Sequence, residues 1–63
     1  MILDSFIKKQ VIVKLISGTT LTGILLQADK NMNILLDKAT STVSSTPQSA
    51  LIKGSKVTYI GIE

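Results

Sequence analysis

The chain has 63 residues and contains neither cysteine nor histidine. Domains this small bury only about 60% of the surface that the unfolded chain exposes, so disulfides, a metal or self-association usually stabilise them. Because cysteine and histidine are absent, self-association remains. Hydrophobic residues make up 44% of the chain and charged residues 17%, which is more apolar side chain than a monomer of this length hides easily. The sequence therefore predicts a single domain, residues 1–63, that forms an oligomer.

No stretch of the chain resembles a membrane span or a secretion signal. Apolar runs stay far below the roughly 20 residues that cross a bilayer, and no signal-peptide pattern opens the chain. We therefore expect a soluble, intracellular protein without a membrane partner. The net charge of +3 suits a polyanionic partner but is too small to identify one.

The apolar pattern predicts one short helix followed by five strands. Residues 2–9 place apolar side chains at the spacing of a helical face. Strands are expected at residues 11–15, 21–28, 34–39, 50–52 and 57–62. Gly23 interrupts the second of these, where a glycine commonly marks a bulge or a sharp bend. The expected fold is mostly β: a five-stranded, strongly bent antiparallel small barrel, an outline that SH3-like and oligonucleotide-binding barrels share.

Three polar segments separate the later strands. Residues 29–33 are too few to leave the sheet, so we expect a hairpin tip there. Residues 40–48 are rich in serine and threonine and contain the single proline, which predicts an exposed loop. Residues 53–56, with the sequence KGSK, are expected to form a tight turn.

Two segments make the sequence recognisable. VKLISG at 13–18, Gly23 and DKNMNILL at 29–36 together resemble the first motif of the Sm/LSm family, and IKGSKVTYI at 52–60 resembles the second. The occurrence of both motifs in this order is far more specific than either alone. The resemblance implies the Sm fold and a non-enzymatic subunit, without cofactor, of a ring that binds uridine-rich single-stranded RNA.

The motif details also suggest a subtype. The short connecting loop resembles the smaller eukaryotic subunits, and the NMN and GSK segments are similar to a core Sm subunit of the D type. A eukaryotic-type subunit would serve small nuclear ribonucleoprotein assembly and pre-mRNA splicing in the spliceosome, or mRNA decay, and would be nuclear and/or cytoplasmic. Which of these particles the chain belongs to stays open.

The two polar turns contain the candidate RNA-binding residues. Asn33 carries an amide that donates and accepts, so it can match the Watson–Crick edge of a splayed base. The resemblance implies that Asn33 reads uracil and that Asp29 braces the loop. It also implies that the Lys53 side chain covers one face of the base and that Gly54 permits close backbone approach. Asn31 stands where the family often has a ring that stacks on the base, so it would contribute more weakly. Asparagine, aspartate and Lys-Gly are also common in turns that bind nothing.

The last two predicted strands would be exposed edges in a monomer, and an apolar edge favours pairing with another chain. The resemblance implies that they pair between neighbouring subunits and close a ring of six or seven. We expect Leu51, Val57, Tyr59 and Ile60 to form that interface. The alternative function is a protein-interaction module that uses its exposed edges without binding RNA.

Catalysis has little support in the sequence. Without cysteine or histidine there is no nucleophile–base pair of the usual kind and no ordinary metal cluster. Among the four carboxylates only Asp29 and Asp37 lie near the proposed site. We therefore expect no enzyme, no catalytic residues and no metal.

Overall fold

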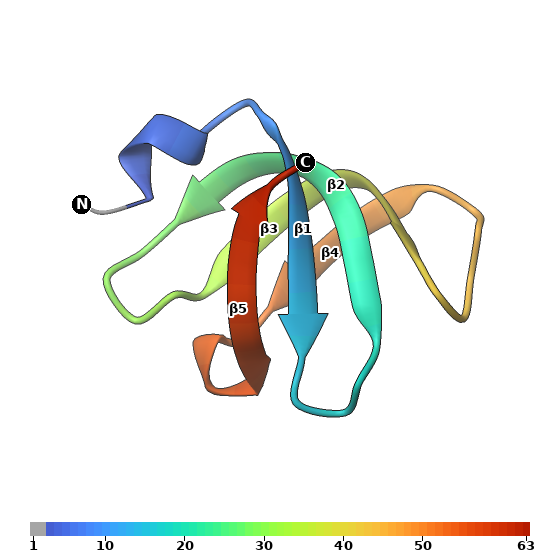
Figure 1. The fold of residues 1–63 in the computed structure, drawn as a ribbon. Coiled ribbons are helices and arrows are strands. Elements are labelled where there is room, and N and C mark those ends of the chain that lie inside the picture. Colours follow the sequence, from blue (N-terminus) through green and yellow to red (C-terminus); the bar gives the residue numbers. More distant parts are fainter. Residues whose placement is uncertain (1–2) are drawn as a thin grey trace.

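The computed structural model describes residues 3–63 and is built mainly of strands (Figure 1). The strands are β1 (Gln10–Leu15), β2 (Thr20–Ala28), β3 (Ile34–Ser41), β4 (Gln48–Ile52) and β5 (Val57–Ile62), and two 3-10 turns, η1 (Asp4–Phe6) and η2 (Gly54–Lys56), precede β1 and β5. All strand pairs are antiparallel, and the sheet order is β4-β3-β2-β1-β5. The mostly β, five-stranded fold expected from the sequence is confirmed.

The strong bend of β2 occurs where the sequence places a glycine. The pairing of β2 with β3 shifts register between Thr22 and Ile24. A side chain on Gly23 would lie 3.0 Å from the Cα atom of Ala39 and 3.0 Å from the carbonyl oxygen of Asp37. Gly23 therefore lets β3 approach closely as the two strands curl together.

The core lies inside this curled sheet and is small. Strand β1 shows the alternation most clearly, because Val11 and Val13 are fully buried while Ile12 is only half-buried. The buried side chains come from four strands and from the residue just before η1: Leu3, Val11, Val13, Leu25, Ile34, Leu36, Ala39 and Ile52. No helix among the residues described here is long and apolar enough to cross a membrane.

The N-terminal segment differs from the helix expected over residues 2–9. Residue 2 lies outside the described residues, and the described part forms only the single 3-10 turn η1. The chain leaves this turn through Lys8, whose φ is 68°. The backbone of Lys8 then donates to Leu25 at 2.6 Å, and Leu25 donates back to Lys9 at 3.0 Å. These bonds to β2 compete with further helical turns.

The serine- and threonine-rich loop is shorter than predicted. Strand β3 continues to Ser41, which pairs with Leu21, and β4 already begins at Gln48. Residues 42–47 are all exposed and form the loop between them. Hydroxyl-bearing side chains are compatible with a strand. The composition of the loop therefore placed the end of β3 too early and the start of β4 too late.

Candidate functional site

The hairpin tip at residues 29–33 is closed by its own backbone. Asp29 donates to the carbonyl of Asn33 at 3.1 Å, and Met32 donates to the carbonyl of Asp29 at 3.0 Å. Met32 adopts a left-handed φ of 62°, and its half-buried side chain packs against the core. The Met32 side chain therefore fixes the tip to the core, while Asn31 and Asn33 remain exposed.

The Asp29 carboxylate holds this tip together from inside. Its Oδ1 accepts the backbone N–H groups of Asn31 and Asn33, both at 2.9 Å, and its Oδ2 accepts the Asn33 side-chain Nδ2 at 2.9 Å. The Asn33 side chain first, and then the backbone N–H groups, hold the pKa of Asp29 below its ordinary value of 3.8. The carboxylate is therefore ionised at neutral pH and serves as an acceptor only.

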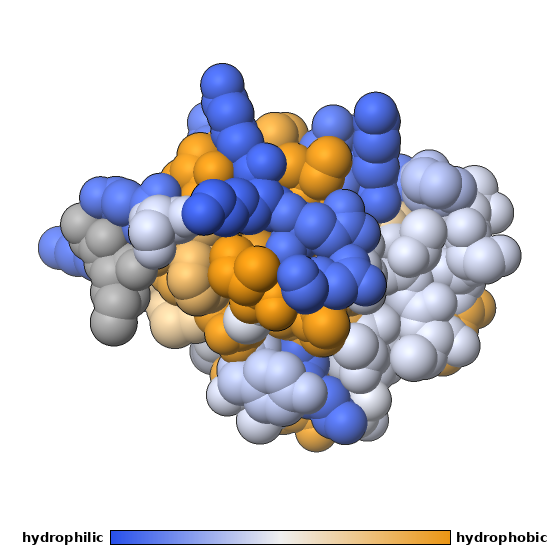
Figure 2. Space-filling model, turned by 45° about the horizontal axis from the view of Figure 1, so that its top comes forward, coloured by the Kyte–Doolittle hydropathy of each residue, from blue (hydrophilic) through white to orange (hydrophobic). Residues whose placement is uncertain are grey.

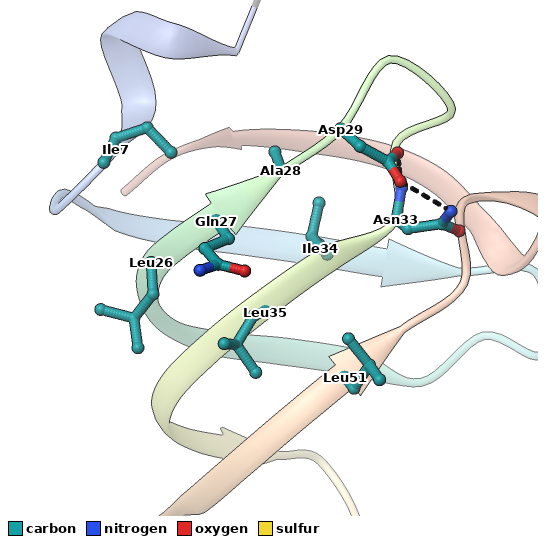
Figure 3. Close-up of a pocket in the computed structure, with 9 residues that line it drawn as sticks. All are labelled: Ile7, Leu26, Gln27, Ala28, Asp29, Asn33, Ile34, Leu35 and Leu51. Atoms are coloured by element: carbon teal, nitrogen blue, oxygen red, sulfur yellow. Dashed lines mark hydrogen bonds between the residues drawn. The ribbon is translucent and has the colours of Figure 1, made fainter.

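The Asn33 amide connects the two motif turns. Its Oδ1 accepts the backbone N–H of Gly54 at 2.8 Å, across 21 positions of sequence, while its Nδ2 donates to Asp29 (Figure 3). Because one neighbour can only accept and the other can only donate, these bonds determine which end of the amide is oxygen. An amide has two N–H donors and two acceptor lone pairs, and these bonds use one of each. One donor and one acceptor therefore remain for a ligand.

Gly54 allows the second turn to lie against the first. A side chain on Gly54 would overlap the carbonyl oxygen of Asn31 and would lie 2.9 Å from the carbonyl carbon of Met32. The η2 turn itself is closed by Lys56, whose N–H donates to the carbonyl of Lys53 at 2.9 Å. The requirement for glycine here is thus steric, because any side chain would separate the two turns.

The structure brings together the four residues that the sequence assigned to RNA and Asp29, which the sequence assigned to bracing the loop. Lys53 is exposed and immediately precedes Gly54, whose backbone N–H donates to the Asn33 amide. Neither turn contains a ring, since the aromatic residues of the chain are Phe6 and Tyr59. Among residues 3–63 no group of three or more acidic, histidine or cysteine side chains is placed to hold a metal.

A depression of about 450 Å³ lies beside this site, and we refer to it as the edge groove (Figure 3). It is lined by Ile7, Leu26, Gln27, Ala28, Asp29, Asn33, Ile34, Leu35 and Leu51. Figure 2 shows apolar surface bordered by hydrophilic side chains on the side of the molecule that carries the N-terminal turn. Sequence reasoning missed the contributions of Ile7, Leu26 and Leu35. The signal available was that the stretch 21–28 is apolar on both faces.

The four residues expected at a subunit interface fall into two pairs. Leu51 and Tyr59 are 80% and 53% exposed, at the two outer strands of the sheet. Val57 and Ile60 are half-buried and pack against the core of their own chain. Leu51 and Tyr59 therefore have the larger surface available for a partner.

Comparison with known proteins is consistent with this geometry. The model of the LSM domain family matches residues 1–62. Comparison with curated proteins finds no match. Two of the similar solved structures are the heptamer of P. aerophilum SmAP1 (TM-score 0.90, 29% identity, 98% of this chain and 88% of that chain covered) and a heptameric archaeal Sm protein (TM-score 0.90, 29% identity, 98% and 96% covered).

A third similar structure is a novel Sm-like archaeal protein from Pyrobaculum aerophilum, with a TM-score of 0.89 and 23% identity. The match covers 97% of this chain but only 48% of that protein, so the chain spans about half its length. At this identity the likeness concerns the fold alone. All three structures named are archaeal.

Proposed function

Because the chain belongs to the LSM domain family, we propose that it is a ring subunit that binds uridine-rich single-stranded RNA. The observation that carries the proposal is the Asn33 amide, which Asp29 and Gly54 hold in one orientation with a donor and an acceptor still available. A fixed amide selects among bases, because its donor and acceptor cannot exchange places to suit a different edge pattern.

Uracil suits such a group on its Watson–Crick edge. That edge presents an N–H donor between two carbonyl acceptors, whereas cytosine presents an amino donor next to a ring-nitrogen acceptor. In this proposal Asn33 reads the edge, the Lys53 side chain covers one face of the base, and Gly54 permits close backbone approach. Asn31 offers a planar amide to the other face. Base stacking on a ring is worth about 1–3 kcal/mol, so a site without one binds a single nucleotide weakly.

Weak single sites favour a multivalent assembly. When several subunits each hold one nucleotide of the same strand, every contact after the first is intramolecular and the total affinity rises steeply. Both structures with 29% identity are heptamers, which supports a ring of six or seven subunits for this chain. Strand β4 of one subunit would pair with β5 of the next, through Leu51, Val57, Tyr59 and Ile60.

The biological setting is a narrower proposal. The similarity of the motifs to eukaryotic subunits suggests a small nuclear ribonucleoprotein, pre-mRNA splicing or mRNA decay, in the nucleus or the cytoplasm. The similar structures named above are archaeal, so they support the RNA-binding ring rather than this subtype. The subtype stays a prediction from the motifs.

Fluorescence anisotropy with labelled oligouridine and oligocytidine tests the proposed specificity. We expect the chain to prefer oligouridine, and Asn33→Ala to weaken that binding at least tenfold, about 1.4 kcal/mol. Ser45→Ala in the exposed loop is the matched control and should change nothing. Binding should also weaken as salt rises, because phosphate contacts release counterions. Equal affinity for both oligonucleotides would contradict the proposal, and no affinity for either would favour the protein-interaction module.

A further inference from the structure

The outer face of the sheet carries a cation and an aromatic ring where β1 and β5 lie side by side (Figure 1). On β1, Val11 and Val13 are fully buried, so the next residue, Lys14, lies on the opposite, outer face. Tyr59 of β5 is the direct partner of Lys14, whereas Ile60 pairs with the buried Val13. Side chains of such a cross-strand pair are close enough to contact one ligand together.

A bulge in β5 comes directly before this tyrosine. Lys14 pairs with Tyr59 but Leu15 pairs with Val57, so Thr58 is an extra residue in β5. Thr58 and Tyr59 are both exposed, unlike the residues on either side of them. Bulges are common beside functional sites, where they change the direction of a side chain.

Neither side chain of the pair is engaged elsewhere. Within residues 3–63 no hydrogen bond or ion pair holds the Lys14 ammonium or the Tyr59 hydroxyl. No buried side-chain nitrogen in that part of the chain lacks a partner, so the Lys14 ammonium is accessible. A side chain at Gly61, the next outer-face position of β5, would meet nothing within 4 Å. We refer to Lys14, Tyr59 and Gly61 as the outer platform.

The platform adjoins the second RNA-binding turn. The η2 turn begins at Gly54 and ends at Lys56, and Tyr59 follows Lys56 by three residues. Lys56 is exposed and adds a second cation at this end of β5. A strand of RNA that leaves the turns can therefore continue onto the outer face without losing contact with cationic side chains.

The nearest carboxylates of the outer face lie at its other end. Asp37 pairs with Ile24, which pairs with Gln10, and the backbone of Glu63 donates to the carbonyl of Gln10 at 3.1 Å. Gln10 is at the start of β1, whereas Lys14 is near its end. Repulsion between these carboxylates and a phosphate at the platform is therefore weakened by distance and by salt.

We infer that the outer platform binds the part of a single-stranded RNA that extends beyond the nucleotides held by Asn33. The Tyr59 ring stacks on a base and Lys14 contacts a phosphate. Rings and cations that act together hold single strands without reading base edges, and stacking strength sets what preference remains. Purines offer the larger ring surface for stacking. This inference rests on the proposed function and extends its RNA contact from the turns to the outer face of the sheet.

Pairing of β5 with a neighbouring subunit is compatible with this role. Strand addition forms hydrogen bonds along the free edge of β5 and extends the sheet, so it does not cover the outer face. One stacked base binds weakly by itself. A uridine tract held at Asn33 raises the effective concentration of the attached RNA at the platform. The platform therefore contributes to long RNA and little to short oligonucleotides.

Fluorescence anisotropy compares a labelled uridine tract with the same tract carrying an oligoadenosine flank at each end. Flanks of about ten nucleotides, at about 3.4 Å each, span the 30 Å length of the chain. We expect the flanks to raise the affinity about fivefold or more, and Tyr59→Leu and Lys14→Gln each to remove most of this gain. Both variants should bind the bare tract like the unmodified chain. Lys38→Gln, which removes the same charge at an exposed position of β3, is the matched control.

Flanks that add no affinity, or a gain that survives in both variants, would overturn the inference and leave the proposed function intact. A bare tract that does not bind would overturn both. An equal loss in Lys38→Gln would assign the gain to net charge and overturn the platform. Native mass spectrometry establishes whether Tyr59→Leu still assembles, and if it does not, Lys14→Gln decides the question alone.

Discussion

At the scale of single residues, the site depends on how little freedom the Asn33 amide has. The motif indicated Asn33 as the base-reading residue and Asp29 as its brace, and both lie in the tip as hydrogen-bonded neighbours. The bond from Gly54 to Asn33 was not predictable from residue types, because it joins two turns that are distant in sequence and depends on how the sheet curls. The Asn33 side chain is therefore held both by a bond within its own turn and by a bond from the distant Gly54.

The lowered pKa of Asp29 predicts a pH dependence of stability. Its native pKa lies below the ordinary 3.8, so the ionised carboxylate stabilises the folded chain fully above about 3.8 and loses this effect as the pH falls through the native value. Asp29→Asn should therefore lower the melting temperature at neutral pH, and the gap to the unmodified chain should narrow below about pH 3.8. Glu63→Gln, at the exposed C-terminal end, should show a smaller gap. A gap for Asp29→Asn that is independent of pH would contradict this account.

At the scale of elements, the strands were predictable and their ends were not. Apolar runs separated by polar turns located all five strands, and Gly23 located the bend, because both signals are local and do not depend on distant partners. The N-terminal segment satisfied a helical pattern too, but its bonds to Leu25 limit it to one turn. A short apolar pattern cannot show that hydrogen bonds to a distant strand will override the helical preference of the segment.

The contact between the η2 turn and the β2–β3 tip gives a second prediction at this scale. Gly54→Ala would place a methyl group against the Asn31 carbonyl, so we expect the two turns to separate, the Asn33 bond to be lost and the fold to be destabilised by about 1–3 kcal/mol. RNA affinity should fall as well. Gly61→Ala is the control, because its methyl group meets nothing within 4 Å. Thermal melts of the two variants that coincide would show that the turns are not coupled through Gly54.

At the scale of the whole molecule, the absence of cysteine and histidine and the excess of apolar residues predicted an oligomer. The structure adds where the excess surface lies, since the edge groove is assembled from Ile7, Leu26, Leu35 and Leu51 on separate elements. That juxtaposition could not be read from the sequence, because the bend of the sheet creates it. Leu51 and Tyr59, at opposite ends of the sheet, leave the monomer with two complementary apolar edges.

Native mass spectrometry of the purified chain, alone and with short oligouridine or oligocytidine, tests the central claim most directly. The account predicts a closed ring of six or seven identical subunits whose mass increases by one oligouridine and is unchanged by oligocytidine. A monomer that binds neither oligonucleotide, or a ring that takes up both to the same extent, would contradict it.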